Sequence, residues 1–264
     1  MPVGYLIDIQ GTLIEDDTRR PVRGAPEALA SLRERGVPFV LVTNNTKLPS
    51  EDFRRYLKAQ GFVFSDDQYL DPLMVLTKRL PPCPAAAYGS PQFLSLLKRL
   101  GYTLDTDAPE AVLIGIKPDF TNDEYAEMIE AVMGGAKPVG MHETSVYAKN
   151  GRRYPGVGAI LKMVAFATGR PYEVVGKPSR AFYETALSML SAQGANVAAN
   201  EAEMISDDLF GDLVGAKRMG MATTLVLSGK IRSVEEVAHR LEEGADRVAS
   251  DIGARLDVPK KERL

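Results

Sequence analysis

The sequence predicts an α/β protein whose parallel sheet is covered by helices on both faces. Short apolar runs alternate with amphipathic segments along the 264 residues. The runs VGYLID (3–8) and VPFVLVT (37–43) are continuously apolar, which is typical of strands that are buried on both faces. Between them, residues 25–36 carry apolar side chains at helical spacing and end in Gly36, a favourable residue just after a helix.

The same alternation continues to the end of the chain. Ser50 and the two acids after it predict the start of a helix over 50–61. The segment TNDE (121–124) is a capping box that opens the helix 121–133, and SVEE (233–236) is a second one. Residues 144–155 resemble a β-hairpin that turns at Asn150-Gly151. The other expected elements are strands at 85–89, 111–115, 172–176, 203–207 and 222–227, and helices at 90–101, 156–168, 179–193 and 210–219.

Composition excludes several classes of function. A net charge of -3 and a pI near 5.6 give no basic surface for nucleic acid or an anionic membrane. A single cysteine, Cys83, excludes an internal disulfide framework and a cysteine-based metal cluster. No apolar stretch reaches the roughly 18 residues that a membrane span needs, and MPVGYLID lacks the pattern of a signal peptide. We therefore expect a cytoplasmic protein.

Polar side chains follow four of the expected strands where each strand ends. In open parallel sheets, functional groups gather beyond the carboxyl ends of the strands. One aspartate in such a place is commonly only a helix cap, but four strand ends with polar groups indicate a site. The residues are Asp8 and Gln10, then Thr43 and Asn44, then Lys177, and finally Asp207, Asp208 and Asp212.

These residue types suit phosphoryl chemistry. Carboxylate and carbonyl oxygens are the ligands that Mg²⁺ prefers. Lys177, the Thr43 hydroxyl and the Asn44 amide are donors that could hold phosphoryl oxygens. An aspartate beside a metal ion can attack phosphorus and form an aspartyl-phosphate. Asp208 and Asp212 have an alternative role, which is to cap the helix predicted at 210–219.

Four segments together resemble a known family. DIQGT, VTNN, VVGKPS and ISDDLFGDLVGAKRMGM are similar, in this order, to the four motifs of the haloacid dehalogenase superfamily. The resemblance implies a Rossmann-like three-layer core formed by residues 1–75 and 176–264. The interval between the second and third motifs implies an inserted α/β cap domain at 76–175. This placement resembles the class IIA branch, which includes nitrophenylphosphatase-like and phospholysine/phosphohistidine/pyrophosphate phosphatase-like members.

The resemblance also implies roles for the residues. Asp8 would be the nucleophile and a ligand of Mg²⁺, with the backbone carbonyl of Gln10 and the carboxylate of Asp207 as further ligands. The phosphoryl group of a small phosphorylated substrate would be held by Thr43, Asn44 and Lys177. The supporting residues would be Asp208 and Asp212, acting directly, through water or by orienting Lys177. The branch is also compatible with a homodimer.

Two positions depart from the family pattern. Phosphatases of the family usually carry a second aspartate, an acid and base, where this chain has Gln10, and Gln cannot transfer protons at neutral pH. General acid–base catalysis contributes about 10²–10⁴-fold, or roughly 3–5 kcal/mol. We therefore expect substrates with good leaving groups, namely aryl phosphates, P–N bonds, acyl phosphates or pyrophosphate. The second departure is Ser206, where a glycine is usual and only a local adjustment is expected.

Two other functions stay open at this stage. Gln10 also fits a weak or inactive protein that binds phosphate ligands without turnover. Dehalogenases of the superfamily lack the second acid and use no Mg²⁺, but their cap lies in a different interval. Their acids would also lack the cation that Asp207 and its neighbours need beside Asp8. Substrate choice in either case depends on the cap, where Tyr147, Arg153 and Tyr154 are the first candidates.

Overall fold

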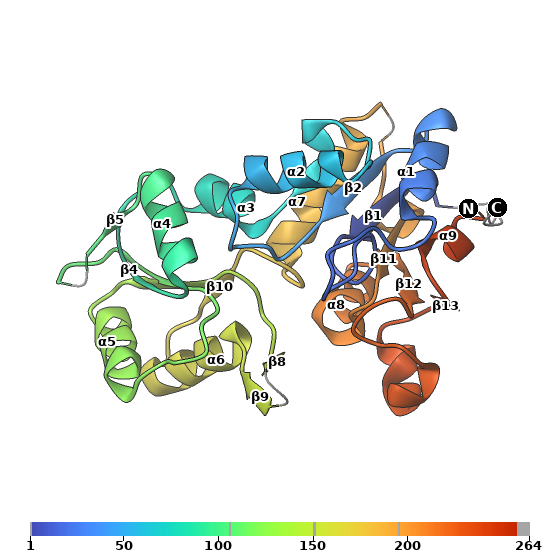
Figure 1. Cartoon of the computed structure of the whole chain (residues 1–264). Helices are drawn as coiled ribbons and strands as arrows, with labels where there is room; N and C mark the ends of the chain where they lie inside the picture. Colours follow the sequence, from blue (N-terminus) through green and yellow to red (C-terminus); the bar gives the residue numbers. More distant parts are fainter. Residues whose placement is uncertain (1, 106, 150–151, 195, 258–264) are drawn as a thin grey trace. The chain divides into compact units, whose positions relative to one another are not determined.

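The computed structural model describes residues 2–105, 107–149, 152–194 and 196–257. The chain forms two compact units, which we describe separately (Figure 1). The first unit contains residues 1–43, 51–70 and 183–264, and the second contains 44–50 and 71–182. The segment 76–175 therefore lies within the second unit. Its identity as a cap with these limits stays a prediction.

The first unit is built on a six-stranded sheet in the order β13-β12-β11-β1-β2-β3. Every neighbouring pair runs parallel. All residues of β1, β2 and β11 are buried, which explains the apolar runs of β1 and β2, while β11 includes the buried Glu203. The strands are β1 (Gly4–Asp8), β2 (Phe39–Val42), β3 (Tyr69–Leu70), β11 (Ala202–Ser206), β12 (Ala222–Val226) and β13 (Arg247–Ala249).

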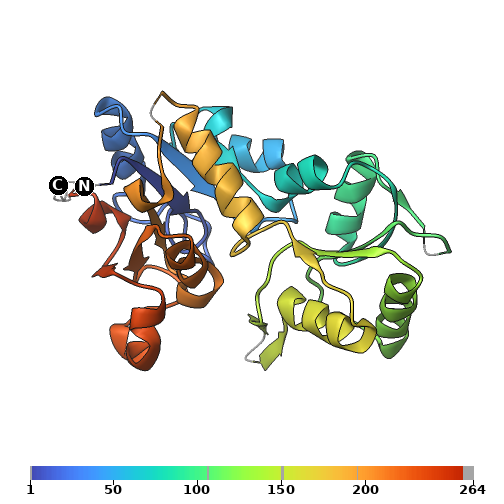
Figure 2. The ribbon, with the colours of Figure 1, turned by 180° about the vertical axis from the view of Figure 1, so that it is seen from behind.

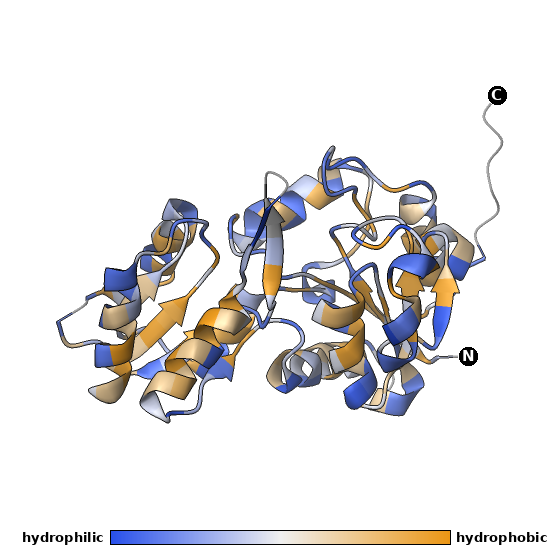
Figure 3. Ribbon diagram, turned by 90° about the horizontal axis from the view of Figure 1, so that it is seen from below, coloured by the Kyte–Doolittle hydropathy of each residue, from blue (hydrophilic) through white to orange (hydrophobic). Residues whose placement is uncertain are grey.

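Helices cover this sheet. Figure 2 shows α7 in front of the strands, and the side chain of Leu190 on α7 approaches Gly4 of β1. The helix α9 contacts α1, β12 and β13, and α8 contacts β12. Colouring by hydropathy shows the strands as the apolar interior and the helices with mixed faces (Figure 3). The helices are α1 (Ala25–Glu34), α2 (Ser50–Ala59), α7 (Arg180–Ser191), α8 (Val214–Arg218) and α9 (Ile252–Arg255).

The second unit has its own parallel sheet, in the order β10-β7-β6-β4-β5. Figure 1 shows α4 on one face of this sheet and α5 with α6 on the other. The strands are β4 (Pro84–Tyr88), β5 (Thr103–Leu104), β6 (Ala111–Ile114), β7 (Lys137–Gly140) and β10 (Glu173–Val174). The helices are α3 (Pro72–Arg79), α4 (Pro91–Arg99), α5 (Asn122–Met133) and α6 (Val157–Thr168).

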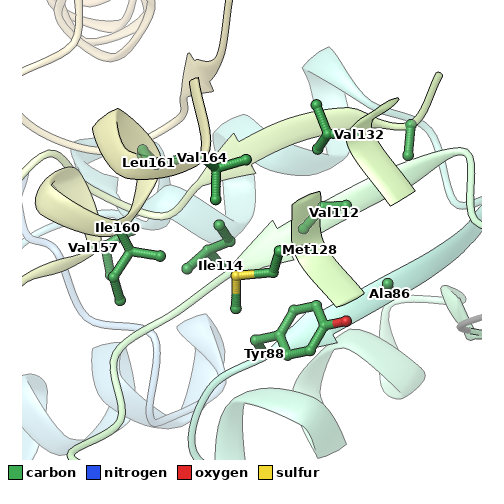
Figure 4. Close-up of a cluster of buried hydrophobic side chains, with 11 residues drawn as sticks. Ala86, Tyr88, Val112, Ile114, Met128, Val132, Val157, Ile160, Leu161 and Val164 are labelled. Atoms are coloured by element: carbon green, nitrogen blue, oxygen red, sulfur yellow. The ribbon is translucent and has the colours of Figure 1, made fainter. Parts of the chain in front are cut away.

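One face of this second sheet carries a compact core. Met128 of α5 and Ile160 of α6 meet Val112 and Ile114 of β6 and Tyr88 of β4 (Figure 4). These side chains are almost fully buried, so the second unit has a hydrophobic core of its own.

Two local predictions in the second unit have clear outcomes. The capping box is present, because the Thr121 hydroxyl accepts from the Glu124 N–H at 3.2 Å and Glu124 accepts from the Thr121 N–H at 2.9 Å. The hairpin is present as antiparallel strands β8 (Val146–Lys149) and β9 (Arg152–Pro155). Its predicted turn at 150–151 lies outside the described residues.

Elsewhere the structure differs from the predicted elements. The helix predicted over 210–219 is a π-helical turn, η3 (Leu209–Leu213), followed by the short helix α8. The capping box at 233–236 opens 3₁₀ turns, η4 (Val234–Glu236) and η5 (Ala238–Glu243). Among the described residues, no helix has the length and apolar character of a membrane span. The predicted fold class, parallel α/β with a second α/β part, is confirmed.

A buried ion pair gives the first testable prediction. Glu203 is fully buried on β11, and its Oε1 accepts from Arg255 Nε at 2.7 Å and from the Thr224 hydroxyl at 2.6 Å. Arg255→Ala removes the less exposed of the two arginines near this buried carboxylate and the one in closer contact, so we expect a loss of about 3–5 kcal/mol in unfolding free energy. In thermal melts of the whole chain, this loss of unfolding free energy should appear as a large fall in Tm.

Arg247 provides the matched control. Its guanidinium is 3.6 Å from the other oxygen of Glu203, but its side chain is 55% exposed. Exposed ion pairs contribute about 0–1 kcal/mol, so Arg247→Ala should barely move Tm. Equal shifts for the two variants would contradict the assignment of Arg255 as the partner that compensates Glu203.

Candidate active site

Asp8 and Asp207 lie at the same edge of the first sheet. Asp8 is the last residue of β1, and Asp207 directly follows β11. The two strands are parallel neighbours, with Ile7 opposite Ile205. Both carboxylates are nearly buried, with 4% and 3% of each residue exposed. The pairing therefore brings together the two acids that the strand ends predicted.

Two glycines make room for the Asp207 carboxylate. A Cβ atom would stand 2.0 Å from Asp207 Oδ2 if placed on Gly11, and 2.2 Å from it if placed on Gly229. The backbone N–H of Lys230 donates to the same oxygen at 2.6 Å. Ser228 donates to the Gly11 carbonyl at 2.7 Å and links this turn to the loop after β1. Ends of β1, β11 and β12 thus converge on one carboxylate.

Asp208 and Asp212 have different local partners. Asp208 Oδ1 accepts from the Gly211 N–H at 2.8 Å and caps the π-helical turn, which is the capping alternative raised by the sequence. Its Oδ2 pairs with the Lys230 ammonium at 2.7 Å. Asp212 Oδ2 instead accepts from the Ser206 hydroxyl at 2.6 Å. The serine that replaces the usual glycine therefore holds a predicted site residue.

Tyr183 and Lys230 are site neighbours that the sequence did not reveal. Tyr183 donates to the Asp212 carbonyl at 2.8 Å. Burial, and then the charges of Asp212, Asp8 and Asp208, raise the pKa of Tyr183 well above its ordinary value. Lys230 could have been found from the SGK turn after strand 222–227, whereas nothing in the helix 179–193 singles out a tyrosine.

Thr43 and Gln10 form a direct pair in the first unit. The Thr43 hydroxyl donates to Gln10 Oε1 at 2.7 Å, and the Thr43 N–H donates to the Leu70 carbonyl at 3.1 Å. Thr43 is fully buried. The side chain of Gln10 therefore contacts a predicted phosphoryl-binding residue, while its backbone carbonyl is the group predicted to face a metal ion.

Asn44 and Lys177 come together in the second unit. Asn44 Oδ1 accepts from the Lys177 N–H at 2.8 Å, and Asn44 Nδ2 donates to the Lys177 carbonyl at 3.3 Å. Lys177 is only 2% exposed. The chain passes from the first unit to the second between Thr43 and Asn44. The acids and Thr43 thus belong to the first unit, and Asn44 and Lys177 belong to the second.

The charges around Asp207 make a divalent cation a good fit. Burial raises the pKa of Asp207 from its ordinary 3.8 to about 7. The Lys230 N–H opposes this shift, while the charges of Asp16, Asp212 and Asp208 add to it. A cation would offset this clustering of buried negative charge, and oxygen donors suit Mg²⁺.

The donor set is small. Within the described residues, no three His, Cys, Asp or Glu side chains are grouped as a metal cluster. The predicted ligands are only two carboxylates, Asp8 and Asp207, with the carbonyl of Gln10. Such a set leaves places for water, as Mg²⁺ commonly requires.

The first unit has a cavity of about 380 Å³ next to Gly229, one of the two glycines beside Asp207. It is lined by residues 15–18 of the loop after β1 and by Ser228, Gly229 and Arg232. Burial and the neighbouring charge of Asp17 raise the pKa of Asp16. The loop between β1 and α1 therefore adds acidic groups to the same edge of the sheet.

Two family models match the N-terminal and C-terminal parts of the chain. Residues 5–103 match a model described as haloacid dehalogenase-like hydrolase, and residues 174–254 match a second model of HAD-like hydrolases. Haloacid dehalogenase-like hydrolase domain-containing protein 2 of Mus musculus is 31% identical over 88% of this chain and 86% of its own length. The chain belongs to the haloacid dehalogenase-like hydrolase family.

Further relatives agree with the branch that the motifs indicated. Phospholysine phosphohistidine inorganic pyrophosphate phosphatase of Homo sapiens is 28% identical over 97% of this chain and 93% of its own. The solved p-nitrophenyl phosphatase from Archaeoglobus fulgidus has a TM-score of 0.82 at 22% identity, covering 98% of this chain and 99% of its own. NagD from E. coli K-12 has a TM-score of 0.74 at 23% identity, covering 96% and 97%. The resemblance predicted from the motifs is confirmed.

The raised pKa of Asp207 gives a pH-dependent prediction for the metal-free protein. The folded chain holds a proton on Asp207 up to about pH 7, whereas an unfolded chain loses it near its ordinary 3.8. The resulting stabilisation is complete below pH 4 and is lost as the pH rises through 7. In EDTA, Tm of the wild type should therefore fall across this window relative to Asp207→Asn, which stays neutral.

Asp208→Asn is the control for this comparison, because Asp208 is paired with Lys230 at 2.7 Å. That variant should keep the pH dependence that Asp207 confers. An unchanged difference between wild type and Asp207→Asn from pH 4 to 7 would contradict the raised pKa.

Proposed function

We propose that the chain is a Mg²⁺-dependent phosphohydrolase that acts on a small phosphorylated substrate through an aspartyl-phosphate on Asp8. The enzyme class, a phosphatase, is supported by the family membership and by relatives whose names are those of phosphatases. The observation that supports the mechanism most directly is the parallel pairing of β1, which ends in Asp8, with β11, which Asp207 follows.

The residues have distinct parts in this mechanism. Mg²⁺ bound by Asp8, Asp207 and the Gln10 carbonyl would supply positive charge that lets a carboxylate approach a phosphate. Asp8 then attacks phosphorus, the bond to the leaving group breaks, and Asp8 carries the phosphoryl group until water hydrolyses it. Lys177 and Thr43 hold phosphoryl oxygens during both steps.

Gln10 determines which leaving groups are tolerated. Its amide cannot give a proton to the departing group or take one from the attacking water. In the structure its Oε1 accepts from the Thr43 hydroxyl, which supports a positional role for this side chain. The substrate should therefore carry a leaving group that departs without protonation, as in aryl, P–N, acyl or pyrophosphate compounds.

Two alternatives make different predictions. A phosphate-binding protein without turnover is favoured by Gln10 alone, and it would release no stoichiometric burst of product when mixed with substrate. A dehalogenase, the minor alternative, would keep its activity in EDTA. The proposed phosphatase loses activity in EDTA and regains it with Mg²⁺. The cap assignment of 76–175, the homodimer and the cytoplasmic location stay predictions.

The role of Gln10 gives a direct kinetic prediction. Wild type should cleave aryl phosphates much faster than alkyl phosphates, because alkyl alkoxides need protonation to leave. Gln10→Asp supplies an acid and should raise alkyl phosphate turnover by about 10²-fold, with a smaller gain for aryl phosphates. Steady-state kcat on matched aryl and alkyl phosphates measures both effects.

Gln10→Glu serves as the matched variant, since it adds a carboxyl group at a different reach. Equal wild-type rates on aryl and alkyl phosphates would show that the missing acid does not limit the reaction. That result would remove the basis for the proposed substrate class.

A further inference from the structure

Asn44 contacts Lys177 through both ends of its side-chain amide. The oxygen accepts from the Lys177 N–H at 2.8 Å, and the nitrogen donates to the Lys177 carbonyl at 3.3 Å. The two residues are 133 positions apart in the sequence. A planar amide that binds the N–H and the C=O of one residue fixes the position of that residue's backbone.

Gly176 creates the space for this contact. A Cβ atom on Gly176 would lie 2.6 Å from Asn44 Oδ1 and 2.2 Å from the Met141 carbonyl. No positive φ is recorded at Gly176, so close approach and not backbone conformation explains a glycine there. The slot that receives the Asn44 amide is therefore part of the fold of the second unit.

The next residue, Asn45, forms hydrogen bonds with the backbone of its own loop. Its Nδ2 donates to the Leu48 carbonyl at 3.0 Å, and its Oδ1 accepts from the N–H groups of Lys47 and Leu48 at 3.3 and 3.4 Å. Two consecutive asparagines thus have different tasks. Asn45 shapes a local turn, whereas Asn44 contacts Lys177, whose ammonium group is predicted to bind the phosphoryl group.

The direction of the Lys177 side chain depends on a fixed backbone position. Its residue is 2% exposed, so the side chain runs through packed surroundings, and its direction depends on where the backbone is held. The Glu143 N–H also donates to the Lys177 carbonyl, at 3.4 Å. Asn44 adds the shorter contact to the N–H and joins Lys177 to the segment that directly follows Thr43.

We propose that Asn44 is a positioning residue, whose side chain sets the place of Lys177 and does not itself bind the phosphoryl group. This inference rests on the proposed function, because it assumes that Lys177 binds phosphoryl oxygens. It replaces the direct phosphoryl contact that the sequence predicted for the Asn44 side chain. Two polar residues of the VTNN motif then have different partners. Thr43 contacts Gln10 in the first unit, and Asn44 contacts Lys177 in the second.

A double-mutant cycle on the full-length protein tests this. Inorganic phosphate binding is measured by calorimetry with Mg²⁺, and kcat and KM are measured on 4-nitrophenyl phosphate. Asn44→Ala should weaken phosphate binding about tenfold in the wild type. It should have no further effect in a Lys177→Met background, because residues that act through one another are not additive.

Matched variants separate positioning from general damage. Asn45→Ala loses a comparable side chain and should leave phosphate binding within about twofold, even if Tm falls. Asn44→Asp keeps the acceptor for the Lys177 N–H and should recover part of the affinity. Circular dichroism confirms that each variant is folded.

Three outcomes would overturn the inference. If Asn44→Ala lowered phosphate affinity equally in the wild-type and Lys177→Met backgrounds, Asn44 would act independently of Lys177. A tenfold loss of phosphate affinity in Asn45→Ala would mean that the loop as a whole, and not the contact of Asn44 with Lys177, controls binding. A wild type that binds no phosphate would remove the proposed function as well. A chain that binds phosphate with the predicted coupling, but turns over no substrate, would support the positioning role of Asn44 and contradict only the proposed phosphatase activity.

Discussion

The parallel pairing of β1 with β11 is the constraint on which the candidate site depends. Parallel neighbours end at the same edge, so the register that puts Ile7 opposite Ile205 also puts Asp8 beside the residues that follow β11. Asp8 ends the buried strand β1, and Asp207 directly follows the buried strand β11. The core of the sheet therefore fixes the strand ends from which both acids project.

This arrangement places several negatively charged groups close together in buried surroundings, which is unfavourable. Several acids share one edge, and the carboxylate of Asp207 lies in a slot formed by Gly11 and Gly229, where it accepts from the Lys230 N–H. Such a slot stabilises the folded chain only if the negative charge is offset by a proton or a cation. Lys230 pairs with Asp208 at 2.7 Å and thus compensates one acid of the group.

Much of this could be predicted from the sequence, for physical reasons that also mark the limits. The buried strands β1 and β2 are continuously apolar, so they and the polar residues after them could be predicted. The strand β7 was not predicted, because its KPVG sequence contains a proline and a lysine. The helix at 210–219 was predicted as one element, but its first turn is π-helical around the Asp208 cap.

Contacts between distant residues were beyond the reach of sequence patterns. The amide of Asn44 looked like a phosphoryl ligand because it follows a strand end, yet its side chain meets Lys177 across 133 positions. Tyr183 lies among the acids without any local signal. Ser206 looked like a neutral replacement of glycine, whereas its hydroxyl donates to Asp212 at 2.6 Å. Periodicity predicts elements, but partners depend on how the elements pack.

A crystal structure of the protein with Mg²⁺ and beryllium fluoride tests the central claim most directly. The account predicts the fluoride mimic of a phosphoryl group on an oxygen of Asp8, and Mg²⁺ at about 2.0–2.1 Å from Asp8, the Gln10 carbonyl and Asp207. Density for the ion elsewhere, with Asp207 still held only by the Lys230 N–H and Asp8 unmodified, would contradict it.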